Sequence, residues 1–310
     1  MSYSLPLAKQ VILITGAAGG IGSATALHLA KQYPGICLIL TDFRQEQLEQ
    51  CATLCKQAGA QVLTIPADLT NSVELANIPK AAVKHFGAVH VLINNAGYSQ
   101  SSPVESMSTA TVEKHFQVNI LAPISLIQTL IPVMRRQGFG RIINVSSLAG
   151  CVAFPFEGIY GASKFALEGL SDALRMELSP FNIQVIVIEL GAVLTQAFKN
   201  NTKALIKCIL EPQNTPYSKA FQRLSQLFIE VEQQAWTPEK VAQTIHKTLI
   251  TTHPKPRYVA ASAAVKLSFF IMNKMCPTSI LDRFRKRLYG MNLISQDLPK
   301  YGQLNPENLS

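Results

Sequence analysis

The sequence predicts an α/β fold with a doubly wound parallel sheet of about seven strands and helices on both faces. Three observations lead to this prediction. Short apolar runs alternate with longer amphipathic segments over the first two-thirds of the 310 residues. The short runs are apolar on both faces, which is typical of strands buried in a parallel sheet. A glycine-rich turn, TGAAGGIG, joins the first apolar run to the first amphipathic segment.

Each short apolar run is interpreted as a strand and each amphipathic segment as a helix that covers the sheet. The predicted strands are residues 11–15, 36–41, 62–67, 90–97, 141–147, 183–190 and 257–261. The predicted helices are residues 20–32, 45–57, 72–85, 109–136 with kinks at Pro123 and Pro132, 160–178, and one that begins at Pro238 with Thr237 as N-cap. No strand is expected from Gly191 to Trp236, and the segment after residue 261 is expected to be helical with a break at Pro277.

Composition sets limits on the class of protein. The chain is 48% hydrophobic and 15% charged, which suffices for a large core. We expect no signal peptide, and no spanning helix, because no run of about 18 uncharged apolar residues is present. The six cysteines include no Cys-x-x-Cys pair and no accompanying histidine cluster. They therefore predict reduced thiols, a cytoplasmic location and no metal site.

The net charge of +9 is concentrated in the C-terminal segment. Residues 255–310 hold nine Lys/Arg and three Asp/Glu, a net of +6. Basic and aromatic residues do not interleave as on a nucleic-acid surface, so no nucleic-acid partner is expected.

The glycine-rich turn predicts a nucleotide site. Gly16, Gly20 and Gly22 form G-x-x-x-G-x-G between a strand and a helix. Glycines let the backbone approach a phosphate, and the helix N-terminus supplies amide donors. Asp42 follows the second strand, where a carboxylate can accept hydrogen bonds from an adenosine ribose and would repel a 2′-phosphate. This favours NAD, although Arg44 could accommodate the phosphate of NADP, which remains the alternative.

A tyrosine and a lysine lie one helical turn apart in the stretch IYGASKFALEGL. Tyr160 and Lys164 are at i and i+4, so they share a helix face, and an ammonium beside a phenol favours the phenolate. On its own, the pair is better interpreted as an ordinary surface tyrosine beside a solvated lysine, because a Tyr-x-x-x-Lys spacing arises often by chance.

Six motifs in order resolve this choice, because together they resemble the short-chain dehydrogenase/reductase family. They are TGAAGGIG, ADLT with Asp68, NNAG at residues 94–97, FQVNILAP with Asn119, IINVSSLAG, and YGASK. The resemblance implies a single-domain Rossmann fold over residues 1–259, with a substrate lid at about 197–235 and a basic helical extension at 260–310. It also implies a homodimer or homotetramer.

The resemblance implies a catalytic group of Asn119, Ser147, Tyr160 and Lys164. Ser147 is chosen over Ser146 because it lies thirteen residues before Tyr160, the family spacing. In this group, Tyr160 would exchange a proton with the substrate, and Ser147 would hold the substrate oxygen. Lys164 would lower the pKa of Tyr160 and bind the nicotinamide ribose. Asn119 would support a water-linked proton path. Implied cofactor contacts are Gly16, Gly20, Ile21, Gly22, Asp42, Asp68, Leu69, Asn95, Ala96, Gly97, Tyr160, Lys164, Gly191, Val193 and Thr195. One departure is Leu190-Gly191, where the family usually has Pro-Gly.

Within the family, the catalytic segment looks most like 17-beta-hydroxysteroid and retinol dehydrogenases. This implies an NAD(P)-dependent enzyme that interconverts an apolar secondary alcohol and its ketone, such as a steroid, retinoid or lipid. Phe154, Pro155 and Phe156 would form an apolar wall beside Tyr160, or would simply pack the loop. The lid residues expected to line a pocket are Phe198, Leu205, Ile206, Ile209, Phe221, Leu224 and Phe228.

Other interpretations remain open. The chain could be an oxoacyl or sugar reductase of the same family, or a nucleotide-binding protein without catalysis. The tail stretch PTSILDRFRKRLYG places apolar residues at helical spacing among cations. This face either packs on the enzyme or makes a peripheral contact with an anionic membrane, and internal packing is the favoured interpretation.

Overall fold

The computed structural model describes residues 5–196, 198–200 and 216–294, and its centre is one parallel sheet of seven strands. The strand order is β3-β2-β1-β4-β5-β6-β7, and every neighbouring pair is parallel. The strands are β1 (Val11–Thr15), β2 (Cys37–Asp42), β3 (Gln61–Pro66), β4 (Val91–Asn94), β5 (Gly140–Ser147), β6 (Ile183–Leu190) and β7 (Arg257–Ala260). The predicted fold class is confirmed, and each predicted strand is present with ends shifted by a few residues.

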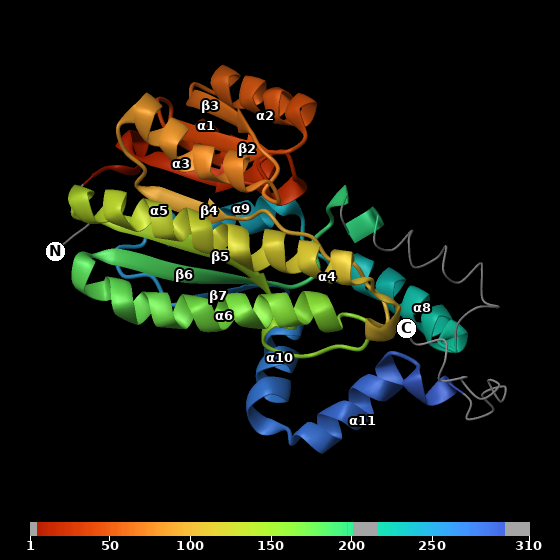
Figure 1. Ribbon diagram of the computed structural model, residues 1–310. Helices are drawn as coiled ribbons and strands as arrows, with labels where there is room; N and C mark the ends of the chain where they lie inside the picture. The colour runs from red at the N-terminus through yellow and green to blue at the C-terminus, as the bar shows by residue number, and fades with distance from the viewer. Residues whose placement is uncertain (1–4, 197, 201–215, 295–310) are drawn as a thin grey trace, which may run out of the picture.

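Helices cover both faces of this sheet (Figure 1). The α-helices of the described residues are α1 (Gly20–Gln32), α2 (Gln45–Gln57), α3 (Ser72–Phe86), α4 (Thr109–Phe116), α5 (Ala122–Gln137), α6 (Gly158–Leu178), α8 (Ser218–Gln234), α9 (Pro238–Ile250), α10 (Ala263–Met275) and α11 (Thr278–Leu288). One core cluster joins the sheet to α1, α2 and α9, and a second joins it to α3, α5 and α6. The sheet is therefore buried on both sides, which explains the continuous apolar strands in the sequence.

The predicted helix at residues 109–136 contains a turn of π-helix. Between α4 and α5 lies a π-helical segment, Gln117–Leu121, in which Ala122 N–H bonds to the carbonyl of Gln117. Pro123 follows directly, and a proline ring clashes with the carbonyl four residues earlier, here that of Asn119. The wider π turn relieves this clash, so the departure from α-helix lies before Pro123, at Asn119.

By length and composition, Thr109–Gln137 is the one helix of the described residues that could cross a bilayer. This differs from the sequence-based expectation that no spanning helix is present. Within the fold this helix covers the sheet. Leu126, Leu130 and Met134 on α5 are fully buried in the second core cluster. This burial accounts for the apolar character of the helix.

Several smaller predictions can be compared with the structure. Thr237 precedes Pro238 in extended backbone, as an N-cap does, but its side chain makes no capping bond. Between Gly191 and Trp236 the described residues form one isolated bridge, from Val193 to Trp236, and no strand. The five cysteines within the described ranges are free, as predicted for reduced thiols. The division into a main domain and an extension stays a prediction.

Candidate active site

The parallel strands end along one edge, and the ends of β1 and β4 meet the glycine turn there. Asn95 Nδ2 donates to the carbonyls of Thr15 at 2.9 Å and Gly16 at 3.2 Å. Thr15 Oγ1 accepts from the backbone amides of Asn95 and Ala96, at 3.1 and 2.9 Å. The two motifs NNAG and TGAAGGIG thus hold each other in place at the point where the strand order reverses, which is where open α/β sheets bind ligands.

Glycine is required at two positions of this turn. Gly16 has φ +66°, and a Cβ there would lie 2.9 Å from the Cα of Ala96. A Cβ at Gly22 would lie 2.2 Å from the carbonyl oxygen of Gly16, so the helix α1 could not approach the turn. Since the first amides of α1 have no partner within the helix, this close packing aims them at the space above the turn.

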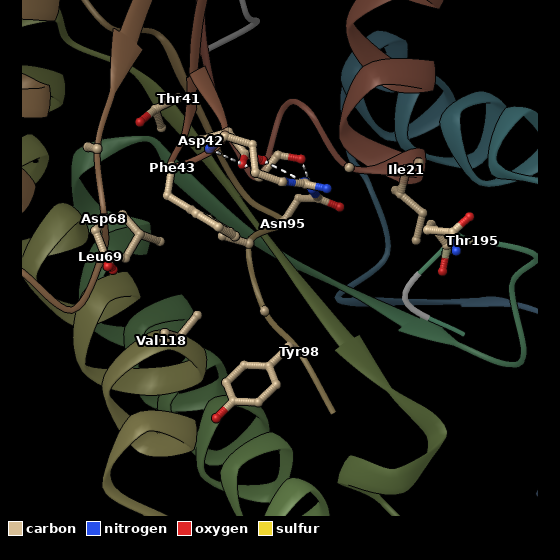
Figure 2. A pocket seen from close by; sticks show the side chains of 18 of the residues that line it. Ile21, Thr41, Asp42, Phe43, Asp68, Leu69, Asn95, Tyr98, Val118 and Thr195 are labelled. Atoms are coloured by element: carbon tan, nitrogen blue, oxygen red, sulfur yellow. Dashed lines mark hydrogen bonds and ion pairs between the residues drawn. The ribbon is translucent and has the colours of Figure 1, made fainter. Parts of the chain in front are cut away.

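A cleft of about 470 Å³ opens beside the turn, a size in the range of small-molecule sites. Ten of the predicted cofactor residues line it: Gly16, Gly20, Ile21, Asp42, Asp68, Leu69, Asn95, Ala96, Gly97 and Thr195. Figure 2 shows Ile21 beside Thr195 on one side and Asp68 with Leu69 on the other. The amide donors of the helix N-terminus and the glycine floor fit the anionic phosphates of a nucleotide, and the carboxylate of Asp42 can accept hydrogen bonds from its ribose.

Five predicted cofactor residues do not line this cleft: Gly22, Tyr160, Lys164, Gly191 and Val193. Gly22 packs the turn, as described above. Gly191 N–H bonds to the carbonyl of Ala260 at 3.1 Å, which ties this residue to β7. Val193 is buried and pairs with Trp236. Tyr160 and Lys164 also belong to the predicted catalytic group, which is described below.

Sequence reasoning missed other residues of the cleft. Phe43, Tyr98, Lys114 and Val118 line it. Phe43 is 70% exposed, and its ring projects into the cleft below Asp42 (Figure 2). Position alone could have pointed to Phe43 and Val118, which are sequence neighbours of Asp42 and Asn119.

The Asp42 carboxylate is held by four hydrogen bonds. It accepts from the backbone amides of Ala18 at 3.1 Å and Arg44 at 3.0 Å. Arg44 also donates its Nε and Nη2 to the two carboxylate oxygens. Asp42 is 5% exposed, so its charge is placed at the cleft by the protein itself.

The four predicted catalytic residues lie close together around α6. Asn119 Nδ2 donates to Ser163 Oγ on α6 at 3.0 Å and to the carbonyl of Tyr98 at 3.1 Å. Asn119 Oδ1 accepts from Tyr98 N–H at 3.1 Å. Asn119 therefore connects the π turn, the chain after β4 and the helix that carries Tyr160. The role of Asn119 in a water-linked proton path stays a prediction.

Lys164 connects the catalytic region to the cleft. Its Nζ donates to the carbonyl of Val145 at 2.8 Å, and a Cβ at Gly97 would lie 3.5 Å from it. Gly97 lines the cleft, so the ammonium lies directly behind the cleft wall. Burial lowers the pKa of Lys164 to about 8, an effect only partly offset by Glu168.

The environment of Tyr160 differs from the expectation that Lys164 lowers its pKa. Burial raises the pKa of Tyr160 to about 12, a hydrogen bond with Ser147 lowers it, and the charge of Glu157 raises it further. Lys164 Nζ lies 5.9 Å from the centre of the Tyr160 ring, turned toward the main chain. The proximity of Ser147 to Tyr160 supports the choice of that serine. Ser146 is buried, and it lowers the pKa of Glu168.

Glu157 is a further residue of this region that the sequence did not reveal. It precedes α6, and Ser101 Oγ donates a hydrogen bond to its Oε1. Burial raises the pKa of Glu157. Its charge acts on both Tyr160 and Tyr289. No sequence signal distinguishes it, since its effect depends on loops that meet only in the folded chain.

An aromatic cluster lies next to these residues. Phe156 packs against Phe221 at 5.1 Å and Tyr217 at 5.6 Å between ring centres, and Phe154 stacks on Tyr289 at 5.9 Å. Leu224 is buried in the same cluster, and Phe198 contacts Phe228 at 5.7 Å. Leu205, Ile206 and Ile209, the other predicted lid residues, lie outside the described residues.

Comparison with known proteins agrees with these features. The family model described as short chain dehydrogenase matches residues 10–205. A 3-ketodihydrosphingosine reductase of Bacteroides thetaiotaomicron is 31% identical over 282 residues, covering 91% of this chain and 98% of that protein. Human 17-beta-hydroxysteroid dehydrogenase type 1 is 28% identical over 289 residues, covering 92% and 87%.

Solved structures show the same likeness. A short-chain dehydrogenase/reductase of Burkholderia phymatum, in complex with NAD, has a TM-score of 0.72 and 25% identity, covering 85% of this chain and 92% of that chain. The ordered motifs, the parallel sheet and the family match lead to one conclusion: this chain is an oxidoreductase that belongs to the short-chain dehydrogenase family.

Proposed function

We propose that the protein uses NAD or NADP to interconvert an apolar secondary alcohol and its ketone, with Tyr160 as the acid and base. The observation on which this depends is the proximity of Tyr160 to Ser147, which lowers the pKa of the phenol, next to the buried Lys164 and behind the wall of the cleft. A binding protein without catalysis has no need of this group.

The cofactor, when bound, supplies or accepts the hydride. In the direction of reduction, Tyr160 donates its phenolic proton to the substrate oxygen, and in oxidation the phenolate takes that proton back. Ser147 Oγ lies within reach of the same oxygen and would orient it by a hydrogen bond. Lys164, whose ammonium lies behind the cleft wall, would bind the nicotinamide ribose. Asn119 holds α6 and the chain after β4 in register.

Two observations support an apolar substrate. The aromatic rings of Phe154, Phe156, Phe221 and Tyr289 form a cluster next to the catalytic helix. The two relatives named above carry the names of a 17-beta-hydroxysteroid dehydrogenase and a 3-ketodihydrosphingosine reductase. A steroid, a retinoid or a long-chain 3-keto compound is the substrate class that we propose.

A spectrophotometric screen tests the proposal. Absorbance of the reduced nicotinamide is followed with NADH and NADPH against steroid, retinoid and long-chain ketones, and against sugars and short oxoacyl thioesters. We expect turnover of the apolar ketones. Tyr160→Phe keeps the ring but removes the proton, so it should lower turnover by roughly 100-fold or more while cofactor affinity is retained.

Each other outcome has a clear meaning. Turnover of sugars or oxoacyl thioesters alone would contradict the apolar substrate class. Near-normal turnover by Tyr160→Phe would contradict the role of Tyr160. Cofactor binding without turnover of any compound would favour a binding protein.

A further inference from the structure

The C-terminal helices α10 and α11 extend away from the sheet beside β7 (Figure 1). One side of this segment is anchored. Leu281 of α11 is 9% exposed, and Leu288 and Tyr289 pack into the aromatic cluster with α8. Gly290 lies so close to α8 that a Cβ there would be 2.8 Å from the side chain of Arg223. The predicted packing of the tail on the enzyme is therefore present, but it uses only part of the apolar surface.

The remaining apolar side chains of these helices are exposed. On α10, Leu267, Phe270 and Ile271 are 62, 58 and 41% exposed and lie at i, i+3 and i+4. On α11, Ile280 and Phe284 are 58 and 51% exposed and also share a face. Large apolar side chains gathered in this way on a surface mark a site of interaction with another molecule or a membrane.

Cations accompany these exposed residues. Arg283 and Arg287 lie three and seven residues after Ile280, on the same stripe of α11 as Phe284, and both are exposed. Residues 263–294 contain six Lys/Arg and one acid, Asp282, a net of +5. Asp282 is 3.8 Å from Arg285, so it does not pair with the two arginines of the stripe.

We propose that α10 and α11 form a docking surface for the anionic face of a lipid bilayer. Apolar side chains edged by cations match both components of such a surface, since the rings enter the acyl boundary and the arginines meet the head groups. A second copy of this chain is a poorer occupant, because it would bring two segments of +5 charge together. A nucleic acid would match the cations but would leave Leu267 and Phe270 exposed.

The position of this surface adds a consequence for the enzyme. Tyr289 at the end of α11 stacks on Phe154 in the loop that precedes the catalytic helix. Docking would therefore place the aromatic cluster next to the bilayer, so that an apolar substrate could enter without crossing water. The docking itself does not depend on the proposed reaction.

Cosedimentation with vesicles tests the docking surface. The full chain is mixed with vesicles of phosphatidylcholine alone or with added phosphatidylserine, at low and high salt. We expect it to pellet with the anionic vesicles, at least about 10-fold more strongly than with neutral ones, and less at high salt.

Two variants and two controls identify the surface. Arg283→Gln with Arg287→Gln should weaken binding to anionic vesicles by roughly 10-fold or more, and Leu267→Gln with Phe270→Gln should weaken binding to both kinds of vesicle. Lys56→Gln with Lys80→Gln, and Leu54→Gln, change exposed residues of α2 and α3 in the same way and should leave binding unchanged. Thermal unfolding shows that each variant is folded.

Three results would overturn the proposal. The first is a protein that stays in the supernatant with anionic vesicles at low salt. The second is equal loss of binding in the control variants. The third is a change of oligomeric state in the Leu267 and Phe270 variant without a change in lipid binding, which would assign the surface to a second copy of the chain. Enzyme activity is not used as a readout, so failure of docking is distinguishable from failure of the proposed function.

Discussion

Arg44 donates two hydrogen bonds, each 3.0 Å long, to the carboxylate of Asp42 at the end of β2. In the sequence, Asp42 favours NAD, whereas Arg44 could accommodate the phosphate of NADP. In the folded chain these two residues are paired with each other. Asp42 neutralises Arg44 and keeps a carboxylate at the place where a ribose hydroxyl is expected. We therefore expect the pair to favour NAD, with Arg44 available for a 2′-phosphate only when Asp42 is removed.

Cofactor preference should follow this pairing. The wild type should prefer NADH, and Asp42→Ala should shift the ratio of kcat/KM values toward NADPH by about 10-fold or more, equal to ~1.4 kcal/mol. Adding Arg44→Ala to Asp42→Ala should abolish the gain for NADPH. Steady-state kinetics with both cofactors measures the ratio. A wild type that already prefers NADPH would show that Arg44 dominates the site.

The pH dependence of activity should depend on Glu157. Its negative charge raises the pKa of Tyr160, so Glu157→Gln should lower that pKa. Alcohol oxidation requires the phenolate, and its rate should therefore rise at a lower pH in the variant, by roughly one pH unit. Glu113→Gln, an exposed change on α4, is the control. An unshifted profile in Glu157→Gln would mean that this charge does not act on Tyr160.

Stability should depend on pH through Lys164, which is 5% exposed. Its pKa is about 8 in the folded chain, against an ordinary value of 10.5, so between these pH values the unfolded chain binds a proton that the folded chain has released. Stability then rises with pH across this window, by an upper bound of roughly 3 kcal/mol from this residue. Below about pH 8 the lysine is charged in both states, and its burial is unfavourable.

The variant Lys164→Met removes this contribution. It should unfold at a higher urea concentration than the wild type near pH 7, and the difference should shrink as the pH rises toward 10. The variant should also lose turnover and cofactor affinity. If Lys164→Met is less stable at neutral pH, the bond to Val145 outweighs the burial of the charge.

Two glycines in helices should respond in opposite ways to alanine. A Cβ at Gly22 would lie 2.2 Å from the carbonyl of Gly16, so Gly22→Ala should destabilise the fold by ~2–4 kcal/mol and weaken nucleotide binding. A Cβ at Gly169 on α6 meets nothing within 4 Å, so Gly169→Ala should stabilise by up to ~1 kcal/mol. Urea unfolding and nucleotide titration measure both effects, and a tolerated Gly22→Ala would contradict the close packing of α1 on the turn.

Much of the site follows from local patterns. Gly16, Gly20 and Gly22 are recognisable because a sharp turn between a strand and a helix admits little else. Tyr160 and Lys164 share a helix face at i and i+4, a spacing that any helix preserves. The edge where these segments meet follows from the parallel order of the strands, since their carboxyl ends align.

Other features could not be predicted because they depend on contacts between distant segments. The role of Glu157 arises from loops brought together by folding. The spacing of PTSILDRFRKRLYG predicts one apolar face, but the structure divides it between a buried Leu281 and an exposed Phe284. Which apolar residues of α11 are buried depends on the surface that packs against this helix, here α8.

The sequence by itself determined the sheet, the glycine turn, the order of the motifs and the positions of Asn119, Ser147, Tyr160 and Lys164 along the chain, because periodicity and steric limits act over a few residues. Only the tertiary structure decided the charge states and partners of those residues. The Lys164 ammonium donates to the carbonyl of Val145. Burial raises the pKa of Tyr160, whereas the sequence predicted that Lys164 would lower it. Desolvation depends on everything packed around a group, and that surrounding exists only once residues far apart in the sequence have come together.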